Sequence, residues 1–433
     1  MISLLIHFDK PHSQFYLNIS LFLFSIFSII YLSCSKSPTN QSDEELIIAW
    51  WNLSTRKELT EKIIADFNKE NPDITITPSF NTPLDHQEKL KVAASSSALP
   101  DFWFNLGGTL GSFYAENGLS YNLTNYARQN NWDSKFSKIA LSLASFDDNL
   151  AGYPTCINMI GIFYRKDVFN EVGLEVPQTF EEFENVMAIL KSKDYTPMVV
   201  AGKEGWHVMR LLEALIEHYA GSEEHDKLSS LKTSWNTKSV IDAFTKFKEY
   251  IDKGYFPNGF VTLSGSDAKS LLYSKDAIMS PEGPWQESNI YNDNQDHNIY
   301  GYFKFPLSEN GNRMSGFVEM IQFNANLNEK KLAAVMKFVD FIYSPESIQK
   351  YMPLIKQPVS RLDNKLPDKY SMTAQMLKDM EKYGSYTISD MGLPSEVIYK
   401  FFEAQDSVAT GIMTPEQAAE FMEDAIKAYQ ESK

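Results

Sequence analysis

Cysteine is nearly absent from this chain of 433 residues, which contains only Cys34 and Cys156. Cys156 stands alone in an apolar stretch, where a cysteine usually packs as a small hydrophobic side chain. We therefore expect Cys156 to have no catalytic role.

Basic residues are also few relative to acidic ones. The 40 Lys and Arg residues are outnumbered by 56 Asp and Glu residues, so the net charge is −16. A protein that binds nucleic acid needs a basic face to neutralise phosphates. The composition therefore argues against a nucleic-acid partner.

Recognisable catalytic motifs are missing. No G-x-S-x-G occurs, and the glycine-rich "LGGTLGS" at 106–112 lacks the Lys-Ser/Thr ending of a phosphate loop, so we interpret it as a close-packed loop. The histidines are scattered, and residues 218–226 and 291–297 are better explained as polar loops than as cation sites. We predict no catalytic residue, no metal and no cofactor, and glycoside hydrolysis has no positive support.

Only one long apolar run is present, from Leu17 to Leu32, and it carries no charge. Sixteen residues are few for a membrane span but suit a secretion signal. The run is followed by Ser33, Cys34 and a polar stretch, which together resemble a bacterial lipoprotein signal. This resemblance implies a signal peptide at 1–33, lipidation of Cys34 and a tether at 34–44, and an uncleaved anchor is the alternative. Either way, the body of the protein is expected outside the cytoplasmic membrane.

The rest of the chain alternates between strand and helix patterns. Short apolar or alternating runs at 45–51, 74–80, 100–105 and from 161 predict strands. Runs with helical spacing predict helices, and the alternation indicates an α/β fold. The predicted helices cover 54–73, 179–193, 209–221, 236–256 and 330–346, with further helix from about 396 and a restart at Pro415.

Five stretches, taken in order, resemble the bacterial extracellular solute-binding proteins of the sugar-transporter type, relatives of maltodextrin-binding protein. They are the opening strand and helix, "LPDFWF", the segment from "AGYPTC" to "PQTFEEF", "DAIMSPEGPW" and the terminal "EAQDSV…IKAY". The resemblance spans about 45–430.

This resemblance implies a two-lobed α/β fold, type II, with the ligand between lobes joined by crossing strands. Lobe one is expected at 45–157 plus 314–353, and lobe two at 158–313 plus 354–433. The implied function is that of the monomeric binding component of an ABC-type importer. It closes on a mono- or oligosaccharide by a hinge motion and delivers it to permease subunits without acting on it as an enzyme.

A sugar site needs aromatic platforms beside polar side chains. By motif, Trp285 after the Gly-Pro turn and Trp206 before a helix are expected to contact ligand. Trp103, Trp132 and Trp235 are expected to pack in the interior. Further candidates are Trp51, Asn52, Asn105, Asn158, Glu282 and Arg361.

Several of these candidates keep a structural alternative. Trp50 and Trp51 must point to opposite faces of their strand, so at most one can face ligand. Glu282 could reach sugar hydroxyls or simply be solvated, and Arg361 could be a hydroxyl ligand or a surface charge.

Three other functions remain open from the sequence. The ligand could be a different small polar solute. The chain could be an anchored carbohydrate-active enzyme, which would need a pair of carboxylates in the cleft. It could also be a structural surface lipoprotein without a ligand.

Overall fold

The structure is a computed structural model that describes residues 45–355 and 357–432, apart from the side chains of residues 83 and 84. The expected signal peptide, the lipidated Cys34 and the tether lie outside the described residues. Within the described ranges, no helix combines the length and apolar character that a membrane crossing demands. Residues 45–433 group as one compact unit.

A six-stranded sheet forms around the predicted first strand, and we call it the first sheet. Its order is β2–β1–β3–β10–β11, with β6 also paired to β10. β1 runs parallel to β2 and β3, whereas β10 runs antiparallel to β3 and β6. The strands are β1 (Leu46–Leu53), β2 (Ile74–Asn81), β3 (Phe102–Leu106), β6 (Tyr153–Met159), β10 (Met314–Phe323) and β11 (Ser385–Thr387).

The side chains of β1 alternate as the sequence predicts. Ile48 and Trp50 are buried, and the Trp50 ring stacks on Phe102 with 5.2 Å between the ring centroids. Trp51 points to the other face of the sheet, where it packs beside Trp103. The expectation that the two adjacent tryptophans face opposite ways is therefore confirmed.

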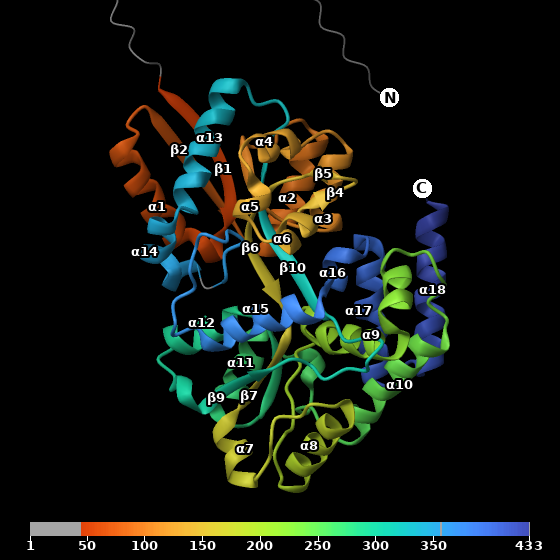
Figure 1. Ribbon diagram of the computed structural model, residues 1–433. Coiled ribbons are helices and arrows are strands. Elements are labelled where there is room, and N and C mark those ends of the chain that lie inside the picture. Colours follow the sequence, from red (N-terminus) through yellow and green to blue (C-terminus); the bar gives the residue numbers. More distant parts are fainter. Residues whose placement is uncertain (1–44, 356, 433) are drawn as a thin grey trace, which may run out of the picture. The chain divides into compact units, whose positions relative to one another are not determined.

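A second, smaller sheet has the order β8–β7–β9 and is antiparallel throughout. Only Ile160 separates β6 in the first sheet from β7 in the second, so the chain passes from one sheet to the other there. Figure 1 shows β6 and β10 running between the two groups of helices that surround the sheets. The strands are β7 (Gly161–Arg165), β8 (Met279–Glu282) and β9 (Tyr300–Phe303), and a separate hairpin joins β4 (Ser145–Phe146) to β5 (Asn149–Leu150).

Helices surround both sheets, as an α/β fold requires. Around the first sheet, α1 packs against α13, with 4.9 Å between the Phe67 and Phe338 ring centroids. The helices up to α9 are α1 (Lys57–Glu70), α2 (Pro83–Ser95), α3 (Thr109–Glu116), α4 (Thr124–Gln129), α5 (Trp132–Lys135), α6 (Lys138–Leu143), α7 (Lys166–Val172), α8 (Phe180–Ser192) and α9 (Trp206–Ser229). The remaining helices are α10 (Lys238–Asp252), α11 (Gly265–Ser274), α12 (Trp285–Asn292), α13 (Glu329–Ile342), α14 (Pro345–Ile355), α15 (Ser371–Tyr383), α16 (Ser389–Gly392), α17 (Ser395–Ala409) and α18 (Pro415–Glu431).

The helix signals in the sequence were accurate at most ends. Thr179 and Glu182 form the expected capping box on α8, and Pro415 occupies the first turn of α18. The expected end at Gly221 is wrong. Gly221 adopts φ +72° and ψ 163°, which kinks the chain, and helix resumes beyond it to Ser229.

The glycine-rich loop before α3 is close-packed, as expected. A Cβ atom on Gly107 would lie 2.3 Å from the Leu143 carbonyl oxygen, and one on Gly108 would lie 2.2 Å from the Met391 carbonyl oxygen. The Thr109 hydroxyl lies 3.0 Å from the carbonyl oxygens of both Met391 and Leu393. This contact joins α3, beside the first sheet, to α16.

A buried carboxylate links α12 to α15. Glu287 is fully buried and accepts hydrogen bonds from the backbone N–H groups of Met372 and Thr373, at the start of α15. It also pairs with His297 at 2.9 Å. The free backbone N–H groups in the first turn of α15 are thus bound by a side chain from a distant segment instead of by an N-cap side chain.

The interior does not divide cleanly between the two sheets. One apolar cluster begins at Ile48 in β1 and continues through β6 and β10 to Tyr300 and Met376. The residue boundaries expected for the two lobes, 45–157 plus 314–353 and 158–313 plus 354–433, therefore stay a prediction.

Candidate functional site

A cleft of about 960 Å³ lies between α2 and α3 on one side and α9, α11, α12 and α17 on the other. This volume is at the upper end of the range usual for small-molecule sites. On the first side it is lined by Thr55, Thr82, Gln87, Lys91, Leu106 and Leu110. On the other side, its apolar and aromatic lining consists of Trp206, Gly265, Trp285, Ile398, Tyr399 and Phe402, and its polar lining includes Lys203, Glu204, Ser264, Ser266, Lys269, Glu282, Gln286, Asn289, Asp390 and Ser395.

Trp285 stands at the first position of α12, directly after the Gly283–Pro284 turn that ends β8. Its ring folds back over this turn, so a Cβ atom on Gly283 would lie only 2.2 Å from it. The ring also lies 6.1 Å from Phe317 of β10, centroid to centroid. Trp285 is half-buried and lines the cleft, so part of its apolar surface remains available.

Trp206 occupies the equivalent place on α9, as its first residue. The preceding Gly205 has φ +78°, and a Cβ atom there would collide with Phe402 at 2.4 Å. Gly265 leaves space for the far edge of the Trp206 ring in the same way. Glycines at these two positions thus let the half-buried Trp206 ring lie along the cleft wall.

Glu282 forms hydrogen bonds to Trp285 and to two residues of α9, Arg210 and His207, the second of which directly follows Trp206. Its Oε2 accepts the Trp285 indole N–H at 2.8 Å and an Arg210 N–H at 3.0 Å. Its Oε1 lies 3.1 Å from His207 Nε2. The carboxylate is 5% exposed, so these three partners hold it in one orientation.

His207 is neutral in this arrangement. Its Nδ1 accepts the backbone N–H of Ala201 at 2.9 Å, so the ring proton is on Nε2 and is donated to Glu282. Burial lowers the pKa of His207. Burial alone would raise the pKa of Glu282, but Arg210 and His207 lower it to about 2. The cluster of Glu282, Arg210 and His207 therefore contains one anion, Glu282, and one cation, Arg210, across the ordinary pH range.

Asp390 is another titratable group in the lining of the cleft. Burial raises its pKa to about 6, and the charge of Arg210 opposes this shift. Behind it, Glu213 of α9 is fully buried and accepts the Ser389 backbone N–H at 2.8 Å. Burial raises the pKa of Glu213 to about 8, against the effect of the hydrogen bond from Ser389.

Sequence reasoning missed several cleft residues. Tyr399 and Phe402, three positions apart on α17, have rings 6.3 Å apart and extend the aromatic wall toward the surface, where Tyr399 is 60% exposed. Their spacing resembles the buried face of an amphipathic helix, so the pattern gave no reason to select them. Gln286 also lines the cleft, and its position directly after Trp285 was the signal in the sequence that could have identified it.

Three predicted site residues are not part of the cleft lining, and their side chains contact other residues of the protein instead. The Asn105 amide donates to Gln322 at 2.7 Å and accepts from Gln87 at 3.1 Å. The Asn52 amide donates to Thr60 at 3.0 Å, and Trp51 packs against the cluster that contains Trp103. In this conformation these side chains stabilise the first sheet, and their contact with ligand stays a prediction.

Asn158 and Arg361 also lie outside the cleft lining. Asn158 is fully buried on β6, and neither polar atom of its amide has a hydrogen-bond partner among the described residues. Arg361 binds Asp363 through two hydrogen bonds and lies 3.8 Å from Asp340. Both ligand roles remain predictions. Of the predicted set, the structure brings together Trp285, Trp206 and Glu282.

The other tryptophans and the second cysteine lie where the sequence predicts. Trp103, Trp132 and Trp235 are at most 3% exposed, and Cys156 is a buried free thiol. Within the described parts of the chain, no three His, Cys, Asp or Glu side chains are arranged to hold a metal ion. His218 and His225 instead contact Ser308 and Glu217.

Comparison with known proteins gives the family. The family model described as bacterial extracellular solute-binding protein matches residues 51–349. The multiple sugar-binding protein of Streptococcus mutans is 27% identical over 344 residues, which is 77% of this chain and 80% of that protein. The galactooligosaccharide-binding protein of Bacillus subtilis is 21% identical and covers 91% of this chain and 92% of its own length.

Solved structures share the fold. A chitin oligosaccharide binding protein superposes with a TM-score of 0.81 at 22% identity, covering 89% of this chain and 99% of its own. The solute-binding protein RafE in complex with raffinose gives 0.75 at 22% identity, covering 88% and 99%. The two-lobed α/β architecture, type II, is therefore confirmed. With a family model that matches most of its length, this chain belongs to the bacterial extracellular solute-binding proteins.

Proposed function

We propose that this protein captures a mono- or oligosaccharide in the cleft and delivers it to the permease of an ABC-type importer. The observation that carries the proposal is the pair of half-buried indoles, Trp285 and Trp206, beside a rim of amide, hydroxyl and charged groups. Sugar rings have apolar C–H faces that stack on such platforms and hydroxyls that bind such a rim. The names of the relatives from Streptococcus mutans and Bacillus subtilis support the same ligand class.

We propose further that the protein works outside the cytoplasmic membrane, held there by a lipid on Cys34. The lipoprotein-like start of the sequence supports the anchor, and the extracellular family supports the compartment. The proposal includes a monomeric protein without a cofactor, because one cleft within one chain suffices for capture and release.

Isothermal titration calorimetry against a defined panel tests the ligand class. The panel contains galactose, raffinose, stachyose and a chitin oligosaccharide, with spermidine, amino acids and divalent metal ions as the comparison set. We expect micromolar or tighter binding of at least one carbohydrate and none of the comparison set. Binding of a comparison compound with no response to any sugar would instead favour a different polar solute.

The enzyme alternative has a specific requirement that the cleft meets poorly. Glycoside hydrolysis needs two carboxyl groups flanking the bond to be cleaved. Glu282 has both oxygens occupied by Arg210, His207 and Trp285, which leaves Glu204 and Asp390 in the cleft lining. Incubation with the panel sugars, followed by chromatography, should show no product. A product that disappears in Asp390→Asn would establish the enzyme alternative.

A further inference from the structure

Arg210 is placed against both tryptophan platforms at once. Its guanidinium carbon lies 4.4 Å from the centroid of the Trp206 ring and 4.9 Å from that of Trp285. The same guanidinium donates to Glu282 and to the Pro281 carbonyl oxygen, both at 3.0 Å. One planar cation therefore touches two rings that begin two different helices, and it is fixed by the segment that carries one of them.

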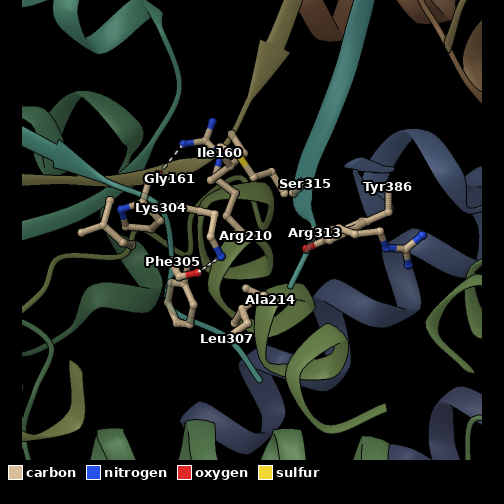
Figure 2. A pocket seen from close by; sticks show the side chains of 13 residues that line it. Ile160, Gly161, Arg210, Ala214, Lys304, Phe305, Leu307, Arg313, Ser315 and Tyr386 are labelled. Carbon is tan, nitrogen blue, oxygen red and sulfur yellow. Dashed lines mark hydrogen bonds between the residues drawn. The ribbon is translucent and has the colours of Figure 1, made fainter. Parts of the chain in front are cut away.

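Arg210 lies behind the cleft wall. It is 8% exposed, and the cavity that it does line is a small space of about 20 Å³, with room for a single water molecule. Figure 2 shows this cavity, which Arg210 shares with Gly161 at the start of β7 and Ser315 of β10. A ligand in the cleft would therefore meet the tryptophan rings and not the guanidinium.

We propose that Arg210 is the positioning residue of the site, which fixes the orientation of Trp206 and Trp285 relative to each other without touching the ligand. This inference deepens the proposed function and rests on it for the identity of the ligand. The positioning itself is a property of the ligand-free protein and is measurable without a sugar.

The chemistry of the guanidinium explains why arginine stands here. A guanidinium is flat, stays charged when buried and can lie over aromatic faces while its edge donates to a carboxylate. Lysine would keep the charge and could still pair with Glu282, but an ammonium is a compact point charge that cannot lie flat over two rings. Arg210→Lys therefore separates ring positioning from charge balance.

Fluorine NMR of protein labelled with 5-fluorotryptophan provides the test. The chain contains 7 tryptophans, and Trp206→Phe and Trp285→Phe variants assign the two resonances of interest. We expect Arg210→Lys to shift or broaden these two resonances together and to leave those of Trp50, Trp103 and Trp235 in place. The double variant Arg210→Met with Glu282→Gln, which avoids an unpaired buried carboxylate, should do the same.

Arg165 supplies a matched control. It is also a buried arginine, 3% exposed, with a carboxylate partner in Asp167 and an aromatic ring, Tyr300, 5.3 Å away, and it does not line the cleft. Arg165→Lys should leave the Trp206 and Trp285 resonances unchanged. Unchanged resonances in both Arg210 variants would overturn the inference. A shift of all tryptophan resonances would overturn it as well, because that result indicates general loosening.

Calorimetry with raffinose and stachyose then links positioning to binding. For whichever sugar binds the wild type, we expect Arg210→Lys to weaken the Kd at least tenfold at a temperature where the variant is fully folded, and Arg165→Lys to leave it within twofold. An unchanged Kd in Arg210→Lys would contradict a role in binding. If neither of these two sugars binds the wild type, the same comparison is made with whichever panel sugar binds. If none of the panel binds, that result counts against the ligand class, and the fluorine experiment still decides the positioning.

Discussion

The indole N–H of Trp285 donates a hydrogen bond of 2.8 Å to Glu282, three residues earlier in the chain, across the Gly-Pro turn that separates β8 from α12. The platform ring is therefore held at its edge by a carboxylate whose other bonds go to Arg210 and His207. Glu282, which the sequence offered as a ligand contact or a solvated charge, has no free oxygen in this conformation. We propose that it supports the ring.

Replacing Glu282 tests this support. Glu282→Gln removes the counter-charge of buried Arg210, and an unpaired buried charge costs about 3–5 kcal/mol of unfolding free energy. Urea unfolding at pH 7 measures this loss. The control Glu204→Gln alters an exposed cleft carboxylate and should change the unfolding free energy by less than about 0.5 kcal/mol. Equal stability of the two variants would refute the supporting role.

Trp285→Ala separates binding from stability. The ring is half-buried, so its removal costs the folded protein little, whereas a bound sugar would lose its platform. We expect sugar affinity to fall by about 1–3 kcal/mol in calorimetry, with a small change in Tm. Trp235→Ala is the opposite case, because that ring is 2% exposed in the interior. It should lower Tm strongly and leave the Kd of the folded protein unchanged. A large Tm loss in Trp285→Ala would show that its ring is a core residue.

Stability should depend on pH through Glu213. Burial raises its pKa to about 8 in the folded protein, against 4.5 for the free side chain, so the folded state holds this proton more tightly. Its stabilising contribution is then complete below about pH 4.5 and is lost as the pH rises toward 8. Between pH 6.5 and 8 we expect the unfolding free energy of the wild type to fall relative to that of Glu213→Gln, with a difference in slope of up to roughly 1.4 kcal/mol per pH unit.

Chemical unfolding at several pH values checks this slope. Comparison with Glu213→Gln removes the opposite contribution of the buried histidines, because their lowered folded-state pKa values are shared by the wild type and the variant. A wild-type slope that persists in Glu213→Gln would assign the effect to another group.

The contact between α3 and α16 should bias the conformation of the cleft. Thr109→Val removes the hydroxyl that lies 3.0 Å from two carbonyl oxygens of the opposite segment, worth about 1 kcal/mol. Loss of this contact should favour a more open cleft, so the ligand-free variant should show a larger radius of gyration in solution scattering and bind sugar about fivefold more weakly. Thr124→Val removes a hydrogen bond between α4 and β5, away from the contact of α3 with α16, and should change neither value.

Lipidation is testable at Cys34. In a bacterial host, the wild-type chain should fractionate with membranes and carry the added mass of acyl chains on its new N-terminus. Cys34→Ser should leave the membrane fraction without that mass. Cys156→Ser changes the buried cysteine and should remain membrane-bound. Membrane retention of Cys34→Ser would favour the uncleaved anchor.

Local signals in the sequence predicted much of the fold because they are spaced along a few residues. The apolar run of β1, the capping box of α8 and the Gly-Pro turn before Trp285 each depend on neighbours within about ten positions. The continuation of α9 beyond Gly221 did not follow from such a signal. A glycine with positive φ usually ends a helix, and here the chain turns and resumes.

Site residues could be predicted from the sequence where a neighbouring turn determines their position. They could not be predicted where partners far away in the chain determine it. Trp285 and Trp206 follow glycine-containing turns that place them in the cleft. Asn105 is also placed by local sequence near the end of β3, but its amide is bonded to Gln322, 217 positions away. Arg210 gave no signal, because two of its partners, Glu282 and Trp285, lie more than 70 positions further along the chain.

Two residues of helix α12 that lie two positions apart, Trp285 and Glu287, make different contacts. Trp285 faces the cleft, while Glu287 anchors the start of α15 through the Met372 and Thr373 backbone. Because the anchor does not involve the ring, the residue at 285 can be exchanged without releasing α15. We therefore expect single substitutions at 285 to alter the proposed ligand contact while α15 stays anchored.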